Sequence, residues 1–203
     1  MIRSPFTQRK PQDFRILMLY PNVQMNSLMP QNIGIFTALL NNAGYKIDLF
    51  DCTYYQDFHF EMNKEDLSEE EMKEKNRSQL IYDVDELLKK GGAPKKTNIK
   101  DDFVKKIQKF RPDLILVSVV ESSWFLAVDL LESVPAKDRK YKTLFGGVFP
   151  TYASDKIIKN QHVDYVCRGE GEEPIIEMCN RLISGGRIDD VQNLTIKADG
   201  QIF

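Results

Sequence analysis

The sequence predicts an α/β fold: a doubly wound, Rossmann-like or flavodoxin-like sheet of five parallel strands in the order 2-1-3-4-5, with a helical insertion. Short apolar runs alternate with segments of helical periodicity along most of the chain, which is typical of right-handed βαβ crossovers. The most strand-like run, residues 113–120 (DLILVSVV), is almost entirely apolar, as expected of a central strand covered on both faces. Two later strands run directly into glycines, which let a backbone approach a ligand closely.

The first two predicted strands flank a helix. Residues 15–20 (RILMLY) predict a buried strand that stops at Pro21, and residues 21–30 predict a loop rich in Pro, Asn and Ser. In the helix that follows, apolar residues recur at helical spacing, and a glycine stands where a C-terminal cap belongs. Residues 45–51 (YKIDLFD) alternate and predict the second strand. The helical positions are Ile33, Phe36, Leu40 and Ala43, followed by Gly44.

Residues 54–96 interrupt this alternation of strands and helices and predict a helical insertion. Residues 61–75 are packed with mixed charges, and an apolar helical stripe follows, ended by Gly91-Gly92. The charges indicate either a solvated face or, as the sharper alternative, a surface that docks a partner. The apolar stripe consists of Leu80, Ile81, Val84, Leu87 and Leu88.

The second half of the chain returns to the alternation of helix and strand. Residues 99–110 predict an amphipathic helix, and 113–120 the third strand. Ser122 or Ser123 can cap the helix that carries Trp124. Residues 142–147 (KTLFGG) and 163–169 (VDYVCRG) predict the fourth and fifth strands, and Pro174 marks the first turn of the last helix. Near the end, Asp199-Gly200 predicts a turn between two short strand-like pieces.

Composition excludes several classes of function. The 203 residues include 28 basic and 30 acidic ones, so the net charge of -2 provides no field that attracts nucleic acid. The longest apolar run, 114–120, is far too short to span a bilayer, and the first residues have no apolar signal region, so we expect a cytoplasmic protein. The three cysteines, Cys52, Cys167 and Cys179, are isolated, as are His59 and His162, so no structural zinc or iron–sulfur site is expected.

The ligand loops are expected at one edge of the sheet. In an open α/β sheet, ligands bind outside the carboxyl ends of the strands, near the point where the strand order reverses. For the predicted order these loops are 21–32, 118–123, 146–151 and 168–173. We expect an exposed arm at 1–13 and the α/β domain at 14–190.

With those loops identified, the chain resembles the N-terminal cobalamin (vitamin B12)-binding domain of cobalamin-dependent radical SAM enzymes. The resemblance covers nearly all of residues 14–203, in the expected order. The matching segments are NNAGYKIDLFD, RPDLILVSVVESSW, LFGGVFPT and VDYVCRGEGEEP. The last two are the specific ones, since the strand patterns alone fit any doubly wound domain.

The resemblance implies how the cofactor sits. The corrin ring would lie over the carboxyl edge of the sheet, with its nucleotide tail passing Ser118 and the Gly146-Gly147 pair. Residues of the loop after the first strand would lie near the lower face of the corrin. The candidate cofactor-binding residues are Asn22, Gln24, Met25, Asn26, Ser118, Val119, Glu121, Ser122, Gly146, Gly147, Val148, Phe149, Pro150, Gly169, Glu170 and Gly171.

Two departures from related proteins refine this expectation. Cobalamin domains of methyltransferases and mutases carry a DxHxxG motif whose histidine ligates cobalt, but the loop here reads PNVQMNSLMPQNIG, so we expect no histidine ligand and no metal-ligating residue. The chain also has no CxxxCxxC loop, so S-adenosylmethionine and the [4Fe–4S] cluster would belong to a radical SAM domain to which residues 191–203 begin the connection. No catalytic residue is expected in this chain, which would serve a methyltransferase-like enzyme.

Other interpretations remain open. A flavodoxin-like module could hold another cofactor or a nucleotide, although neither GxGxxG nor GxxxxGK[ST] follows the first strand. A non-catalytic docking or regulatory domain could use the 54–96 insertion as its interface. Glu170, Glu172 and Glu173 could act as acid and base, but acidic residues in a first helical turn also stabilise a helix N-terminus. Trp124 and Phe125 are expected in the core or at a domain interface.

Overall fold

The computed structural model describes residues 2–22, 30–55 and 95–203. Within them, seven strands form one sheet in the order β2-β1-β3-β4-β5-β6-β7. The strands are β1 (Arg15–Tyr20), β2 (Lys46–Asp51), β3 (Leu114–Ser118), β4 (Lys142–Gly146), β5 (Tyr165–Cys167), β6 (Leu194–Ala198) and β7 (Gln201–Ile202). The first five are parallel and follow the predicted order, which confirms the fold class.

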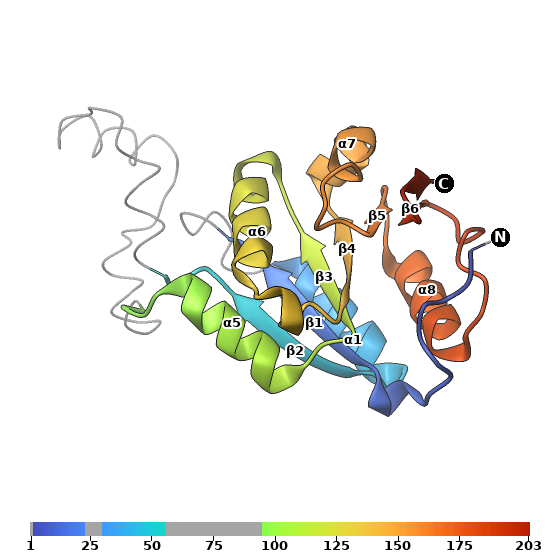
Figure 1. Ribbon diagram of the computed structural model, residues 1–203, viewed down its shortest axis with the longest axis horizontal. Helices are drawn as coiled ribbons and strands as arrows, with labels where there is room; N and C mark the ends of the chain where they lie inside the picture. Colours follow the sequence, from blue (N-terminus) through green and yellow to red (C-terminus); the bar gives the residue numbers. More distant parts are fainter. Residues whose placement is uncertain (1, 23–29, 56–94) are drawn as a thin grey trace.

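Helices cover both faces of this sheet (Figure 1). On one face lie α1 (Gln31–Asn42) and α8 (Glu172–Ser184), and on the other lie α5 (Ile99–Phe110), α6 (Glu121–Ser133) and α7 (Val148–Ile157). Alternate residues of the central strand serve the two layers. Leu114 and Leu116 pack under α1 and α8, whereas Ile115 and Val117 pack under α5 and α6. This explains why β3 reads as a continuous apolar run.

Short-range chemistry sets where the helices begin and end. The side chain of Asn98 accepts hydrogen bonds from the backbone N–H groups of Lys100 and Asp101, which starts α5. The same helix ends at Arg111, which adopts the left-handed conformation with φ 51°. At α6, Ser123 rather than Ser122 satisfies the first turn, because its hydroxyl accepts from the backbone N–H of Val120 at 3.1 Å. Two short 3-10 turns, η1 (Pro11–Asp13) and η2 (Ala136–Asp138), complete the described elements.

Both ends of the chain contact the rest of the domain. Residues 2–13 are exposed or half-buried and lie along α8: the backbone N–H of Arg9 donates to the Ile183 carbonyl at 3.0 Å, and Phe6 packs edge-on against Phe14 at 5.2 Å. At the other end, β6 pairs antiparallel with β5, and β7 folds back on β6. The sheet therefore has two strands beyond the five predicted, and the Asp199-Gly200 turn joins them, as predicted.

Most of the predicted insertion, residues 56–94, lies outside the described residues, as do loop residues 23–29. The described ends of the insertion meet, since the backbone N–H of Lys95 donates to the carbonyl of Tyr54 at 2.7 Å. The two described ends of the insertion therefore lie next to each other, a few residues after β2. None of the described helices is long and apolar enough to cross a membrane.

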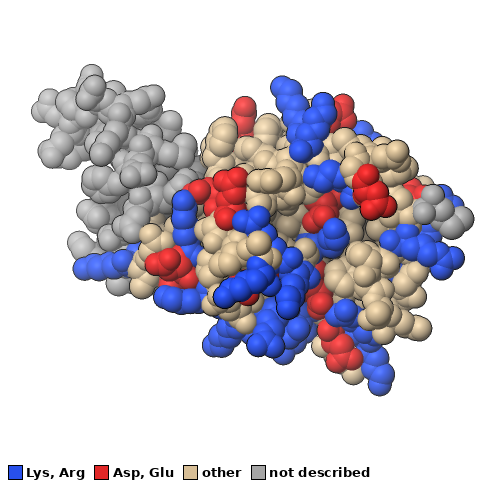
Figure 2. All heavy atoms as spheres, in the orientation of Figure 1, with Lys and Arg blue, Asp and Glu red and all other residues tan. Residues whose placement is uncertain are grey.

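Charges of both signs are mixed over the visible face of the molecule, with Lys and Arg most frequent over α5 and the region beneath it (Figure 2). Several of these basic side chains are neutralised in ion pairs, among them Lys100 with Asp129 at 2.8 Å and Lys106 with Asp48. Because α5 covers the sheet face opposite α1 and α8, this charge is not directed at the space between those two helices.

Candidate functional site

The carboxyl ends of β3 and β4 meet at a narrow junction. Ser118 pairs with Gly146 in the strand register, and the backbone N–H of Val119 donates to the Gly146 carbonyl at 3.0 Å. Gly147 follows with φ 102°, and a Cβ atom on it would lie 2.8 Å from the Val119 carbonyl oxygen and 3.3 Å from the Ser118 hydroxyl oxygen. Only glycine therefore fits at position 147 without moving backbone.

A second pair of glycines shapes the loop between β5 and α8. Gly169 adopts φ 72°, and its N–H donates to the hydroxyl of Thr151 at 3.0 Å. The same Thr151 hydroxyl donates to the carbonyl of Gly147 at 2.8 Å, so one side chain joins the two glycine loops. A Cβ on Gly171 would lie 3.0 Å from Ile175 and 3.2 Å from Phe36, so the missing side chain allows α8 and α1 to approach closely at this point.

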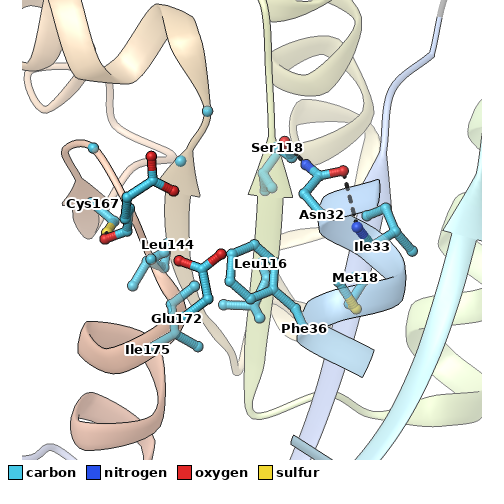
Figure 3. A pocket seen from close by; sticks show the side chains of 16 residues that line it. Met18, Asn32, Ile33, Phe36, Leu116, Ser118, Leu144, Cys167, Glu172 and Ile175 are labelled. Carbon is cyan, nitrogen blue, oxygen red and sulfur yellow. Dashed lines mark hydrogen bonds between the residues drawn. The ribbon is translucent and has the colours of Figure 1, made fainter. Parts of the chain in front are cut away.

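Between these loops and α1 lies a cavity of about 160 Å³, which we call the α1/α8 cavity (Figure 3). Its walls come from the ends of four strands, from one face of α1 and from the start of α8. Its surface is mostly apolar, with a few polar groups near the strand ends. It is lined by Met18, Asn32, Ile33, Phe36, Leu116, Val117, Ser118, Leu144, Gly146, Gly147, Cys167, Gly169, Glu170, Gly171, Glu172 and Ile175.

An amide and a hydroxyl form the polar end of the cavity. The side-chain N–H of Asn32 donates to the Ser118 hydroxyl oxygen at 2.6 Å, and the Asn32 side-chain oxygen accepts from the backbone N–H of Ile33 at 2.9 Å. Both bonds are drawn in Figure 3. Because the amide oxygen is occupied by Ile33, the amide nitrogen must face Ser118. Asn32 thus fixes the position of the hydroxyl at the end of β3.

Two carboxylates and a thiol line the other side of the cavity. Glu172, at the first position of α8, extends from that helix into the space facing Phe36 (Figure 3). Cys167 is buried, and burial together with the negative charges of Glu172 and Glu170 raises its pKa to about 11. The thiol therefore stays protonated at neutral pH. None of the described residues that line the cavity is Lys, Arg or His.

The structure brings six of the predicted site residues together in this cavity and places seven others elsewhere. Ser118, Gly146, Gly147, Gly169, Glu170 and Gly171 line it. Val119 is buried under α5 and α6, Pro150 is buried in α7, and Phe149 packs against Trp124 at a ring distance of 5.9 Å. Glu121, Ser122 and Val148 are exposed at the same edge. Buried Asn22 donates to the Thr53 hydroxyl at 3.0 Å. Gln24, Met25 and Asn26 lie outside the described residues.

Several lining residues were not among the candidate cofactor-binding residues, although Asn32 and Glu172 fall within the predicted ligand loops 21–32 and 168–173. Asn32, Ile33 and Phe36 occupy one face of α1, and their helical spacing predicts a shared face but not its neighbour. Leu116 and Leu144 were assigned to the core without a cavity beside them. Glu172 was weighed as a helix-stabilising acid or a catalytic one, and its position in the cavity depends on how α8 packs against α1.

An exposed apolar rim lies beside the cavity at the carboxyl edge. Val120 at the start of α6 is 47% exposed, and Val148 and Tyr152 of α7 are 63% and 87% exposed. Phe125 of α6 is also largely exposed, whereas its neighbour Trp124 packs edge-on against Phe145 at 5.3 Å. Of the predicted aromatic pair, Trp124 therefore belongs to the core side and Phe125 to the surface.

Comparisons with known proteins agree with this architecture. The family described as the B12 binding domain matches residues 79–178, a span that includes β3, β4 and β5. The anaerobic magnesium-protoporphyrin IX monomethyl ester cyclase of Synechocystis sp. is 33% identical over 61 residues, which are 30% of this chain and 12% of the cyclase.

Solved structures give the same fold over nearly the whole chain. The radical S-adenosylmethionine methyltransferase TsrM from Kitasatospora setae, solved with cobalamin and a [4Fe–4S] cluster bound, matches with a TM-score of 0.62 and 13% identity, over 93% of this chain and 28% of that one. The cobalamin-dependent S-adenosylmethionine radical enzyme OxsB with aqua-cobalamin matches with a TM-score of 0.63 and 14% identity, over 93% and 22%. The chain thus spans less than a third of each of these relatives. The chain therefore shares the fold of the matched parts of these enzymes, and its residues 79–178 match the B12 binding domain family.

Proposed function

We propose that this chain holds cobalamin for a radical SAM enzyme, with the corrin over the carboxyl edge of the sheet and the nucleotide tail in the α1/α8 cavity. The observation that carries the proposal is the cavity itself, which opens beside Ser118 and Gly147 at the strand ends where α/β domains bind ligands. The B12 binding domain match over residues 79–178 supports the choice of cofactor.

The residues present fit the base of such a tail. An apolar cavity of about 150 Å³ is known to hold a benzene-sized ring, and the α1/α8 cavity, at about 160 Å³, is of this order. A whole corrin is far larger, so only the planar base of the tail can enter. The phosphate stays outside, because no described lining residue is cationic and two are carboxylates. The same carboxylates disfavour a nucleotide bound by its phosphates at the start of α8.

Glycine backbone forms one wall of the cavity. The missing Cβ of Gly147 lets the loops after β3 and β4 meet, and Gly146 places a bare backbone in the cavity wall. The exposed rim of Val120, Val148 and Tyr152 lies at the same edge and offers an apolar surface to the face or edge of the corrin. These residues bind and orient the cofactor and keep water from it.

The cobalt would have no histidine ligand from this chain's described residues. The one described histidine, His162, precedes β5 at the opposite, amino edge of the sheet. Bound cobalamin would supply the cobalt-centred methyl or electron transfer of the enzyme. S-adenosylmethionine and its [4Fe–4S] cluster would be held by a radical SAM domain of the same protein, which makes a methyltransferase-type reaction the proposed setting.

A titration with hydroxocobalamin tests this proposal with a matched pair of variants. Gly146→Ala adds a methyl group to the cavity wall without a clash, since its nearest neighbour would be the Cβ of Cys167 at 4.0 Å. The control, Gly34→Ala, adds the same group on the exposed side of α1, where nothing lies within 4 Å. We expect Gly146→Ala to weaken binding at least about tenfold, through crowding of the base.

The control variant and the wild type should bind hydroxocobalamin equally, and thermal unfolding should show that both variants are folded. Equal binding by the wild type and Gly146→Ala would place the tail elsewhere. No retention of cobalamin by the wild type would overturn the proposal itself.

A further inference from the structure

The polar groups of the α1/α8 cavity differ in what they can still bind. Asn32 uses its amide oxygen for Ile33 and its amide nitrogen for Ser118. The Ser118 oxygen therefore accepts a hydrogen bond, and its hydrogen is left to donate. Among the residues that the structure describes, no acceptor meets this hydrogen. Ser118 thus presents one O–H donor at the cavity end of β3.

Glu172 presents the opposite requirement. Its carboxylate can only accept hydrogen bonds when ionised, and no N–H or O–H group of the described chain donates to it. The side chain is partly buried and extends into the cavity, as Figure 3 shows. Glu170, by contrast, is exposed, so water can solvate its carboxylate. Glu172 and Cys167 both line the cavity, and the negative charge of Glu172 helps to raise the pKa of that thiol.

A ring that fills the cavity would displace water from both groups. A carboxylate that loses water without gaining a donor is destabilised, and this cost opposes binding. A base with an N–H group near Glu172 would replace that water with a charge-assisted hydrogen bond. A base without one would leave the carboxylate unsatisfied. Glu172 therefore discriminates between bases that would fill the same space.

Resting on the proposed function, we infer that the cavity selects a cobamide whose lower base accepts a hydrogen bond from Ser118 and donates one to Glu172. Adenine meets both requirements, because it has ring nitrogens as acceptors and an exocyclic amino group as donor. The base of cobalamin, 5,6-dimethylbenzimidazole, has an acceptor nitrogen but no N–H donor once it is joined to its ribose. The specificity-determining residue is Glu172, and Asn32 is a positioning residue that directs the Ser118 hydrogen.

The test compares two cobamides that differ only in the lower base, adeninylcobamide and cobalamin, by measuring their dissociation constants. The wild type is compared with Glu172→Met, which keeps the length of the side chain and removes the acceptor. Glu173→Met is the matched control, because Glu173 occupies the next position of α8, is exposed and does not line the cavity. Both variants remove one acid from the same helical turn, so their effects on the helix are comparable.

The wild type is expected to bind adeninylcobamide about tenfold or more tightly than cobalamin, which is the size of one charge-assisted hydrogen bond. Glu172→Met should weaken the binding of adeninylcobamide and strengthen the binding of cobalamin. Glu173→Met should keep the wild-type ratio of the two dissociation constants. Equal wild-type affinities, or a Glu172→Met variant that shifts both constants by the same factor, would overturn the inference and leave the proposed function standing. If the wild type binds neither cobamide, the proposed function fails and the inference fails with it.

Discussion

Gly147 lies against the backbone of Val119, where the loop that follows β4 contacts the loop that follows β3. The backbone N–H of Phe149 donates to the Val119 carbonyl at 3.4 Å, and a Cβ on Gly147 would lie 2.8 Å from that same oxygen. The two loops therefore approach as closely as backbone allows. This contact fixes the relative positions of Ser118 and Gly147, which both line the α1/α8 cavity.

Replacing Gly147 should destabilise the protein as well as the site. Gly147→Ala must adopt φ 102° and push against the Val119 backbone, so we expect a loss of about 1–3 kcal/mol in the free energy of unfolding. Gly34→Ala on the exposed side of α1 should be neutral or stabilising, because alanine favours a helix. Denaturant unfolding of the two variants checks this. A Gly147→Ala protein as stable as the wild type would show that the loops can separate.

Replacing the amide of Asn32 with a carboxylate should weaken cobalamin binding without lowering the stability of the protein. In Asn32→Asp the side chain can only accept from Ser118, so the hydroxyl hydrogen turns toward the carboxylate and is lost to the ligand. The second position of a helix also favours a negative charge, so stability should not fall. We expect cobalamin affinity to drop about tenfold, the size of one hydrogen bond, in a titration followed by visible absorption. Unchanged affinity would remove Ser118 from the binding site.

Acidification should destabilise the protein through His162. Burial, then the charge of Arg139, lowers the pKa of His162 below its ordinary value of 6.5, although Glu132 opposes the shift. The unfolded chain therefore binds the proton more readily. Stability is lost as the pH falls below the pKa of His162 in the unfolded chain toward its lower pKa in the folded protein. Lys197 also faces this group and acts in the same direction as Arg139.

The measurement is the free energy of unfolding between about pH 7 and pH 5, where histidine titrates. The wild type should lose stability over this range, and His162→Gln, which cannot titrate, should lose less. Parallel curves for the two proteins would mean that His162 is protonated equally in the folded and unfolded states.

The N-terminal arm should detach when Arg9 is removed. Arg9 donates to Asp113 at 2.8 Å and lies over the rings of Phe6 and Phe14 at 5.4 and 5.8 Å. Arg9→Ala is expected to cost about 0.5–2 kcal/mol and to expose residues 2–10 to limited proteolysis. Lys10→Ala, an exposed neighbour, serves as the control and should be cleaved no faster than the wild type. If Arg9→Ala and the control are cleaved at the same rate, the backbone hydrogen bonds of the arm, and not Arg9, hold it against the domain.

The strand order and the strand-end glycines could be predicted from the sequence because both depend on local pattern. The apolar run of β3 and the glycines at positions 146 and 147 indicate their roles without any knowledge of distant contacts. Asn32 and Glu172 fall within the predicted ligand loops, but their roles could not be assigned from the pattern, since each depends on how α1 and α8 pack side by side. The docking of β6 on β5 was missed for a related reason, because antiparallel pairing of a short, polar strand leaves little mark in the sequence.

The central claim is that cobalamin binds with its base withdrawn from the cobalt into the α1/α8 cavity. An electron paramagnetic resonance spectrum of the protein with cob(II)alamin, recorded after gel filtration, tests this most directly. We expect the cofactor to co-elute with the protein and its spectrum to lack nitrogen splitting, because neither the base nor a described histidine would reach the cobalt. A cofactor that separates from the protein, or a spectrum that retains nitrogen splitting, would contradict it.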